Sequence, residues 1–268
     1  IVMNKNFNFS SLFKKANLLS TLLFAFSILC ISFKGLNYGI DFKGGTLIEL
    51  RVIDNNITTS DIRSSFKKLI IGDVSVKEFG KKNDYLIKIE QTKEQDKNFI
   101  EKLKNNIGQN LSSEIIFRRV ENVGPKVSSE LLQSGLIAIF LSLAAMLFYI
   151  WVRFEWQFSI GSIIALFHDV VITMGIFSLL AFEINLSIIA AVLTIVGYSM
   201  NDTVVIYDRI RENLNKYNRL NISEIANLSI NDTLARTIIT SATTLLALLS
   251  IFILGGEILR GFSFAMIL

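Results

Sequence analysis

The sequence predicts a polytopic α-helical membrane protein with one soluble α+β domain inserted between its first and second spans. Of its 268 residues 51% are hydrophobic and only 19% are charged, whereas soluble domains carry about 25% charge. Several apolar runs are long enough to cross a bilayer. Charged residues gather instead in residues 37–128, which divide a first span at 18–36 from a bundle at 129–268. Residues 1–17 form a polar N-terminal segment.

Five apolar runs have spanning length and a sixth begins near the end of the chain. The five lie at about Leu18–Phe33, Leu131–Val152, Phe158–Phe182, Leu186–Ile206 and Thr237–Leu254, and the partial run at Gly261–Leu268. We expect the last span to be cut short here. No small-residue cleavage site follows the first run, so it is expected to remain as an uncleaved anchor.

Lysine and arginine in the short loops predict the orientation, because cytoplasmic loops are enriched in both. With a cytoplasmic N-terminus, the inner segments hold nearly all the basic residues of the short loops, whereas the outer ones hold only Arg260. Residues 37–128 then lie outside. Residues 207–235 form a basic cytoplasmic loop, in which 222–230 predict a short amphipathic helix, either at the membrane interface or on an ordinary surface.

The outer domain shows a βαββαβ order. Alternating patterns predict strands at Thr46–Val52, Asp73–Phe79, Tyr85–Glu90 and Glu114–Val120. A helix capped at Thr58–Ser60 follows the first strand, and residues 93–111 predict a second helix. Gly44 and Gly45 are expected to form a turn that enters the first strand. This order is that of a ferredoxin-like domain.

Asp202 lies in the last third of the fourth apolar run, where an ionised carboxylate is costly. Desolvation penalises its charged form, so Asp202 could accept and release protons. Thr194 and Tyr198 precede it by two turns and one turn on the same helix face. Gly197 is expected to permit close approach of another helix. Alternatively, Asp202 is hydrated from the nearby cytoplasmic end.

Three further polar residues are candidates for a proton relay. Arg236 opens the fifth span at about the depth of Asp202, where it either pairs with that carboxylate or anchors the helix. His168 and Asp169 occupy the middle of the third span, where they form either a relay or a structural hydrogen-bonded pair.

Other chemistries lack a pattern in the sequence. The lone His168 and the lone Cys30 offer no metal-ligand spacing, so no metal is expected. No phosphate-binding loop or hydrolase motif occurs, so neither an ATP cofactor nor an enzymatic activity is expected. The distribution of Lys and Arg indicates membrane orientation, not nucleic-acid binding.

Several motifs together resemble the SecD/SecF protein-export family, in its smaller SecF-type branch, over essentially the whole chain. Gly39, Asp41, Gly44 and Gly45 lie in the segment GIDFKGG, and Gly124 and Pro125 precede the second span. His168-Asp169 marks the third span. Asn201 and Asp202 lie in GYSMNDT, which continues into DRIREN, and Arg236 opens RTIITS.

The resemblance implies an RND-like transmembrane bundle in a bacterial inner membrane, paired with a homologous SecD half. It implies that the proton motive force assists unfolded preproteins after ATP-driven translocation by SecA through SecYEG, with YajC as a further partner. It also implies that Asp202 and Arg236 take part in proton passage. Two alternatives remain from the residues alone, namely an RND-type small-molecule exporter and a non-transporting assembly scaffold.

Overall fold

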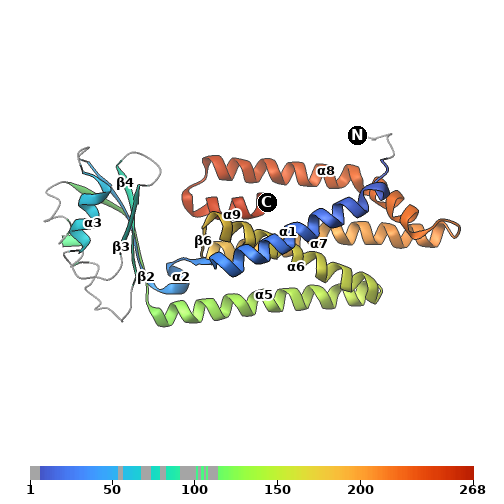
Figure 1. Ribbon diagram of the computed structural model, residues 1–268, viewed down its shortest axis with the longest axis horizontal. Coiled ribbons are helices and arrows are strands. Elements are labelled where there is room, and N and C mark those ends of the chain that lie inside the picture. Colours follow the sequence, from blue (N-terminus) through green and yellow to red (C-terminus); the bar gives the residue numbers. More distant parts are fainter. Residues whose placement is uncertain are drawn as a thin grey trace. The chain divides into compact units, whose positions relative to one another are not determined.

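The computed structural model describes residues 7–53, 57–67, 74–78, 83–90, 101, 104–105, 107 and 114–268. The chain divides into two compact units, Tyr38–Leu136 and a second made of Ile1–Asn37 with Ile137–Leu268. Figure 1 shows the sheet of the first unit and the long helices of the second.

The first unit contains an antiparallel sheet in the order β3-β4-β2-β5. The elements are α2 (Ile40–Lys43), β2 (Gly45–Val52), α3 (Thr59–Lys67), β3 (Val74–Glu78), β4 (Asp84–Glu90) and β5 (Ile115–Val123). Numbered along the chain, the strands lie in the order 2-3-1-4. This is the strand order of a βαββαβ domain of the ferredoxin-like type, and it agrees with the fold class expected from the sequence.

The core of this unit comes from the alternating positions that the sequence indicated. Ile48, Leu50 and Val52 of β2 are buried against Ile62 and Phe66 of α3. Thr58 and Asp61 cap α3 by hydrogen bonds in both directions. The predicted second helix, 93–111, and the hairpin residues 80–82 lie largely outside the described residues; Ile107, which is described, is helical and fully buried.

β5 continues three residues beyond its predicted end. Its pairing with β2 extends to Gly45 opposite Val123, past a register shift at Glu49–Leu50. Pro125 then starts α5 (Pro125–Arg153). Proline suits the first helical position because it lacks an N–H that would be unpaired there. The second spanning helix therefore begins six residues before its apolar run.

Five helices are long and apolar enough to cross a membrane among the described residues. They are η1 (Ser10–Leu12) continuing into α1 (Phe13–Lys34), α5, α6 (Trp156–Leu180), α7 (Leu186–Lys216) and α8 (Ile222–Leu254). The shorter α9 (Glu257–Ile267) follows, and β1 (Asn37–Tyr38) and β6 (Glu183–Ile184) are two-residue strands. All five spans predicted from the sequence are present as helices.

The predicted loop at 207–235 is mostly helical, so that prediction was wrong. α7 continues to Lys216 and α8 begins at Ile222 (Figure 1). A capping box explains the early start, because Asn221 accepts from the Glu224 N–H and the Glu224 side chain accepts from the Asn221 N–H. Nor is 222–230 a separate amphipathic helix; it forms the first turns of α8.

Close packing between α1 and α6 depends on a glycine that the sequence analysis missed. A Cβ added at Gly175 would lie 2.3 Å from Cβ of Ser27, so only glycine fits there. The hydroxyl of Ser178, one turn later, donates to the carbonyls of Cys30 and Gly35. The side chain of Cys30 is buried.

Candidate functional site

A hydrogen-bonded chain of side chains crosses three spanning helices at His168 and Asp169. The ring Nε2 of His168 on α6 lies 2.5 Å from the hydroxyl of Ser20 on α1. Its Nδ1 lies 3.0 Å from Oδ1 of Asp169, and Oδ2 of Asp169 accepts from Ser199 of α7 at 2.7 Å. A ring that donates from Nδ1 to Asp169 can accept from Ser20 at Nε2. Proton transfer and helix locking are both compatible with this chain.

Ser20 and Ser199 complete this network and were not identified from the sequence. Serine is common in spanning helices, and nothing local marks these two. One available signal was the position of Ser199, three residues before Asp202 on the same helix. Phe24, four residues after Ser20, stacks on the His168 ring with centroids 6.0 Å apart and planes at 8°. The His168 side chain is therefore held from both α1 and α6.

Tyr198 links α7 to α8. Its hydroxyl lies 3.2 Å from the carbonyl oxygen of Thr240 and 3.0 Å from the hydroxyl of Thr244. Thr194 is exposed and donates to the carbonyl of Ala190 on its own helix, so it does not join the contact between helices. Of the predicted polar stripe, Tyr198 is thus the residue whose side chain contacts another helix.

Asp202 is half-buried, and its carboxylate takes part in none of the hydrogen bonds or ion pairs found within the described ranges. Arg236 is exposed and lies more than 4.0 Å from that carboxylate, so the ion pair, one of the two alternatives for Arg236, does not form in this structure. The two residues nevertheless lie at the same level of the bundle. Contacts of Tyr198 with Thr240 and of Arg209 with Asp232 bracket both of them.

Asp208, Arg209 and Glu212 of the DRIREN segment form ion pairs at the same end of the bundle. Arg209 contacts Asp232 at 2.8 Å and Glu212 at 2.6 Å. Asn213 is almost completely buried and donates to the hydroxyl of Ser229. These contacts hold the ends of α7 and α8 together, and the nearby carboxylate of Asp202 has no hydrogen-bond or ion-pair partner among the residues that the structure describes.

The structure corrects the interpretation of Gly197 and locates Asn201 of the GYSMNDT motif. Gly197 does not permit a close approach, since a Cβ added there would have no atom within 4 Å. Asn201 is exposed and forms no hydrogen bond within the part of the chain that the structure describes.

The GIDFKGG segment is a structural turn. Gly39 precedes α2, whose first turn contains Asp41. Gly44 and Gly45 have φ of +80° and +146°, values that side chains disfavour. A Cβ on Gly45 would lie 2.5 Å from the carbonyl oxygen of Ile89 on β4. The two glycines therefore bring the chain from α2 directly onto the sheet, as the turn interpretation predicted.

The turn also contacts the start of α5 within the same unit. A Cβ on Gly44 would lie 3.3 Å from Cα of Pro125, and the buried Ser128 hydroxyl donates to the carbonyl of Ile40. Gly124 is in open space and its carbonyl accepts from the Ser128 N–H. Glycines 44 and 45 are thus required sterically, whereas Gly124 is not.

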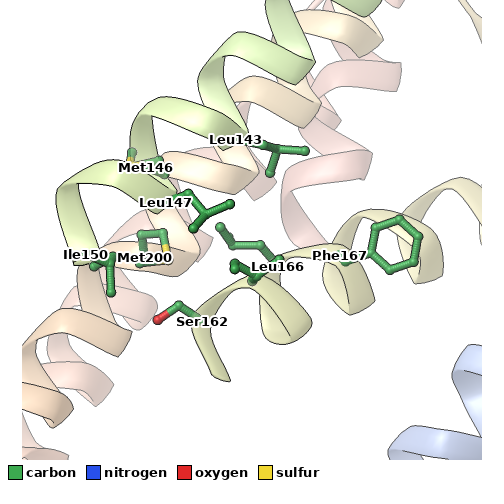
Figure 2. Close-up of a pocket in the computed structure, with 9 residues that line it drawn as sticks. Leu143, Met146, Leu147, Ile150, Ser162, Leu166, Phe167 and Met200 are labelled. Carbon is green, nitrogen blue, oxygen red and sulfur yellow. The ribbon is translucent and has the colours of Figure 1, made fainter. Parts of the chain in front are cut away.

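An apolar cavity of about 90 Å³ lies between α5, α6 and α7. Figure 2 shows Leu143, Met146, Leu147 and Ile150 of α5 facing Ser162, Leu166 and Phe167 of α6 and Met200 of α7. The hydroxyl of Ser162 donates to the carbonyl of Phe158 on its own helix. No group of three or more potential metal ligands occurs among the described side chains. The polar chemistry of the bundle thus resides in the His168 network and the α7–α8 contact.

The sequence matches known protein families over most of its length. The family model described as "Protein export membrane protein SecD/SecF, C-terminal" matches residues 102–268. The chain belongs to the SecD/SecF family. The "SecD/SecF GG Motif" matches residues 31–52, which include the turn at Gly44 and Gly45. Membership of the SecD/SecF family places the chain among the membrane components of protein export.

Curated relatives and a solved structure agree with the SecD/SecF assignment. "Protein translocase subunit SecF" of Rickettsia rickettsii is 46% identical over 260 residues, which cover 96% of this chain and 84% of the relative. The SecF subunit of Rickettsia prowazekii is 44% identical over 265 residues, covering 98% and 85%. The crystal structure of SecDF from Thermus, a "translocon-associated membrane protein", matches with a TM-score of 0.88 at 34% identity. It covers all of this chain, which spans 36% of the length of that SecDF chain.

Proposed function

We propose that this chain is the SecF-type half of a SecD-paired complex that uses the proton motive force to assist preprotein export. The observation that carries the proposal is the carboxylate of Asp202, which lies half-buried in a spanning helix without a direct partner among the described side chains. Intramembrane carboxylates of this kind mark ion pathways. Its relatives are translocase subunits, which supports protein export as the work that the ion drives.

Tyr198 and Arg236 have distinct roles in this proposal. Tyr198 fixes α7 against α8 one turn from Asp202 and so sets the level of the carboxylate. Arg236 lies at the same level but apart, so it can approach the carboxylate only after a movement of α8 or of its own side chain. Protonation neutralises Asp202 and weakens its attraction for Arg236. Proton binding thus alters the attraction between the two helices, whose movement drives the export cycle.

The His168 network couples the proton site to the rest of the bundle. Ser199, which donates to Asp169, lies one turn before Asp202 on α7. A change at Asp202 that shifts α7 therefore alters the contact between α7, α6 and α1. We assign His168 and Asp169 to this coupling, with Thr194 outside it.

The proposal includes an orientation and partners. The chain lies in the bacterial inner membrane with its N-terminus cytoplasmic and residues 37–128 periplasmic, where they meet unfolded preproteins emerging from SecYEG. SecA supplies ATP-driven translocation, YajC joins the complex, and this chain catalyses no covalent reaction. The Lys and Arg asymmetry of the short loops supports the orientation.

Export of a secreted reporter in cells tests the proposal. Asp202→Asn removes the proton site, and Asp208→Asn is a matched control because Asp208 is an exposed carboxylate on the same helix, paired with Arg153. We expect Asp202→Asn to reduce export several-fold at unchanged subunit abundance and Asp208→Asn to leave it intact. Loss of the co-purified SecD partner in Asp202→Asn would favour the scaffold alternative. Normal export with hypersensitivity to one compound would favour the exporter.

A further inference from the structure

Polar contacts hold α7 and α8 together at levels on both sides of Asp202. On one side Tyr198 reaches Thr240 and Thr244. On the other, Arg209 contacts Asp232 and Asn213 contacts Ser229. The contacting residue numbers rise on α7 as they fall on α8, so the two helices are antiparallel. Between these levels, no side-chain hydrogen bond or ion pair joins α7 and α8 among the described residues.

Thr237 of α8 lies at about the same level along the helix pair as Asp202 of α7. Asp202 lies one turn beyond Tyr198, a rise of about 6 Å, and Thr237 lies three residues before Thr240, about 4.5 Å in the same direction. Thr237 is also seven residues from Thr244 and therefore shares the face that Tyr198 touches. Asp202 and Thr237 are thus level with each other on the two facing sides of the helix pair.

The hydroxyl of Thr237 differs from those of the other threonines of α8. Thr233, Thr240, Thr243 and Thr244 each donate to the carbonyl four residues earlier, as threonine in spanning helices commonly does. The Thr237 hydroxyl is buried and has no hydrogen-bond partner in the part of the chain described. A buried hydroxyl without a partner is costly, and such groups commonly bind an ordered water. The half-buried carboxylate of Asp202 and the buried hydroxyl of Thr237, neither with a hydrogen-bond partner among the described residues, therefore occur at one level.

We propose that Thr237 is a positioning residue that holds a water molecule against the carboxylate of Asp202, and that this water delivers the proton. The hydroxyl of Thr237 hydrogen-bonds the water and keeps its own proton. The water passes a proton to the carboxylate, so that an O–H bond forms at Asp202 while one breaks in the hydrated proton. This inference rests on the proposed function for its role in transport, whereas the water bridge is tested separately.

Three variants separate the hydroxyl from the fold. Thr237→Val keeps the shape and removes the hydroxyl, and Thr237→Ser restores it. Thr243→Val is the matched control, because Thr243 is an exposed threonine of the same helix whose hydroxyl donates to the carbonyl of Ile239. All are made in the full chain with its SecD partner.

The first measurement is the infrared carbonyl band of protonated Asp202 in membranes, assigned by its loss in Asp202→Asn. A hydrogen-bonded carboxylic acid absorbs at lower wavenumber than a free one. We expect the band to move to higher wavenumber in Thr237→Val and to keep its position in Thr237→Ser and Thr243→Val. An unmoved band in Thr237→Val, or a shift that Thr237→Ser does not reverse, would overturn the water bridge.

The second measurement is the gradient-driven export rate in vesicles. We expect Thr237→Val to slow it about tenfold, the equivalent of about 1.4 kcal/mol in the barrier, while Thr243→Val matches wild type. If the band shifts in Thr237→Val but export does not depend on the proton gradient even in wild type, the proposed function is refuted, whereas the water bridge is still supported. A shifted band with unchanged gradient-driven export in Thr237→Val would overturn the positioning role.

Discussion

Gly45→Ala is expected to destabilise the sheet of the Tyr38–Leu136 unit by about 2–4 kcal/mol. Two costs add. The backbone of Gly45 has φ +146°, a region that costs other residues about 1–3 kcal/mol. The new Cβ would also lie 2.5 Å from the carbonyl oxygen of Ile89, which is held in the β2–β4 pairing and cannot withdraw without breaking it. Such a clash costs at least a further 1 kcal/mol or so.

Hydrogen exchange on the intact chain in detergent measures this cost locally. Since about 1.4 kcal/mol corresponds to a factor of ten, amide exchange in Gly45–Val52 should accelerate roughly 100-fold in Gly45→Ala. Gly124→Ala is the matched control, because its Cβ would meet nothing within 4 Å. Wild-type protection in Gly45→Ala, or equal damage from Gly124→Ala, would refute the steric account of the glycine turn.

Two further stability predictions concern other parts of the chain. Gly175→Ala forces α1 away from α6 at Ser27 and should lower the melting temperature of the detergent-solubilised chain by several degrees, whereas Gly197→Ala should leave it unchanged; equal melting of both variants would contradict the packing argument. Burial lowers the pKa of Lys88 on β4 to about 8 from 10.5, with the charge of Lys77 adding to the effect. Between these values the unfolded chain binds more protons than the folded one, so the unit should gain stability as pH rises from about 8 to 10.5. Lys88→Met should be more stable at pH 7 and lack that rise in thermal unfolding, and a rise that persists in Lys88→Met would exclude Lys88 as its source.

The sequence predicted the spanning helices and the ferredoxin-like order because both depend on local periodicity. Apolar runs of spanning length marked every span, and Ile48, Leu50 and Val52 marked the buried face of β2. The ends of the helices were harder to predict from the sequence. The residues of 207–235 are polar and resemble a loop, but in the structure they pair across α7 and α8, as in the contact of Asn213 with Ser229. Such pairing between helices is invisible to a window along one helix.

The sequence predicted the ionisable residues of the candidate site but not the residues that form hydrogen bonds with them. Asp202, His168 and Asp169 are conspicuous because charge is rare in apolar runs. Ser20 and Ser199, which complete the His168 network, are ordinary residues until three helices bring them together. The same limit applies to glycines, because Gly197 looked like a packing site and Gly175 is one. For the serines and for the glycines alike, the role of a residue depends on which residues of other helices lie next to it, and a single sequence does not show this.

Export in inverted membrane vesicles under imposed ion gradients tests the central claim most directly. Wild type and Asp202→Asn are compared under a pH gradient and under a sodium gradient, with SecA and ATP supplied for the first stage of translocation. We predict that the pH gradient accelerates completion of export in wild type, that Asp202→Asn abolishes the acceleration, and that the sodium gradient has no effect. Acceleration of Asp202→Asn by the pH gradient to the wild-type extent would contradict the assignment of Asp202 as the proton site.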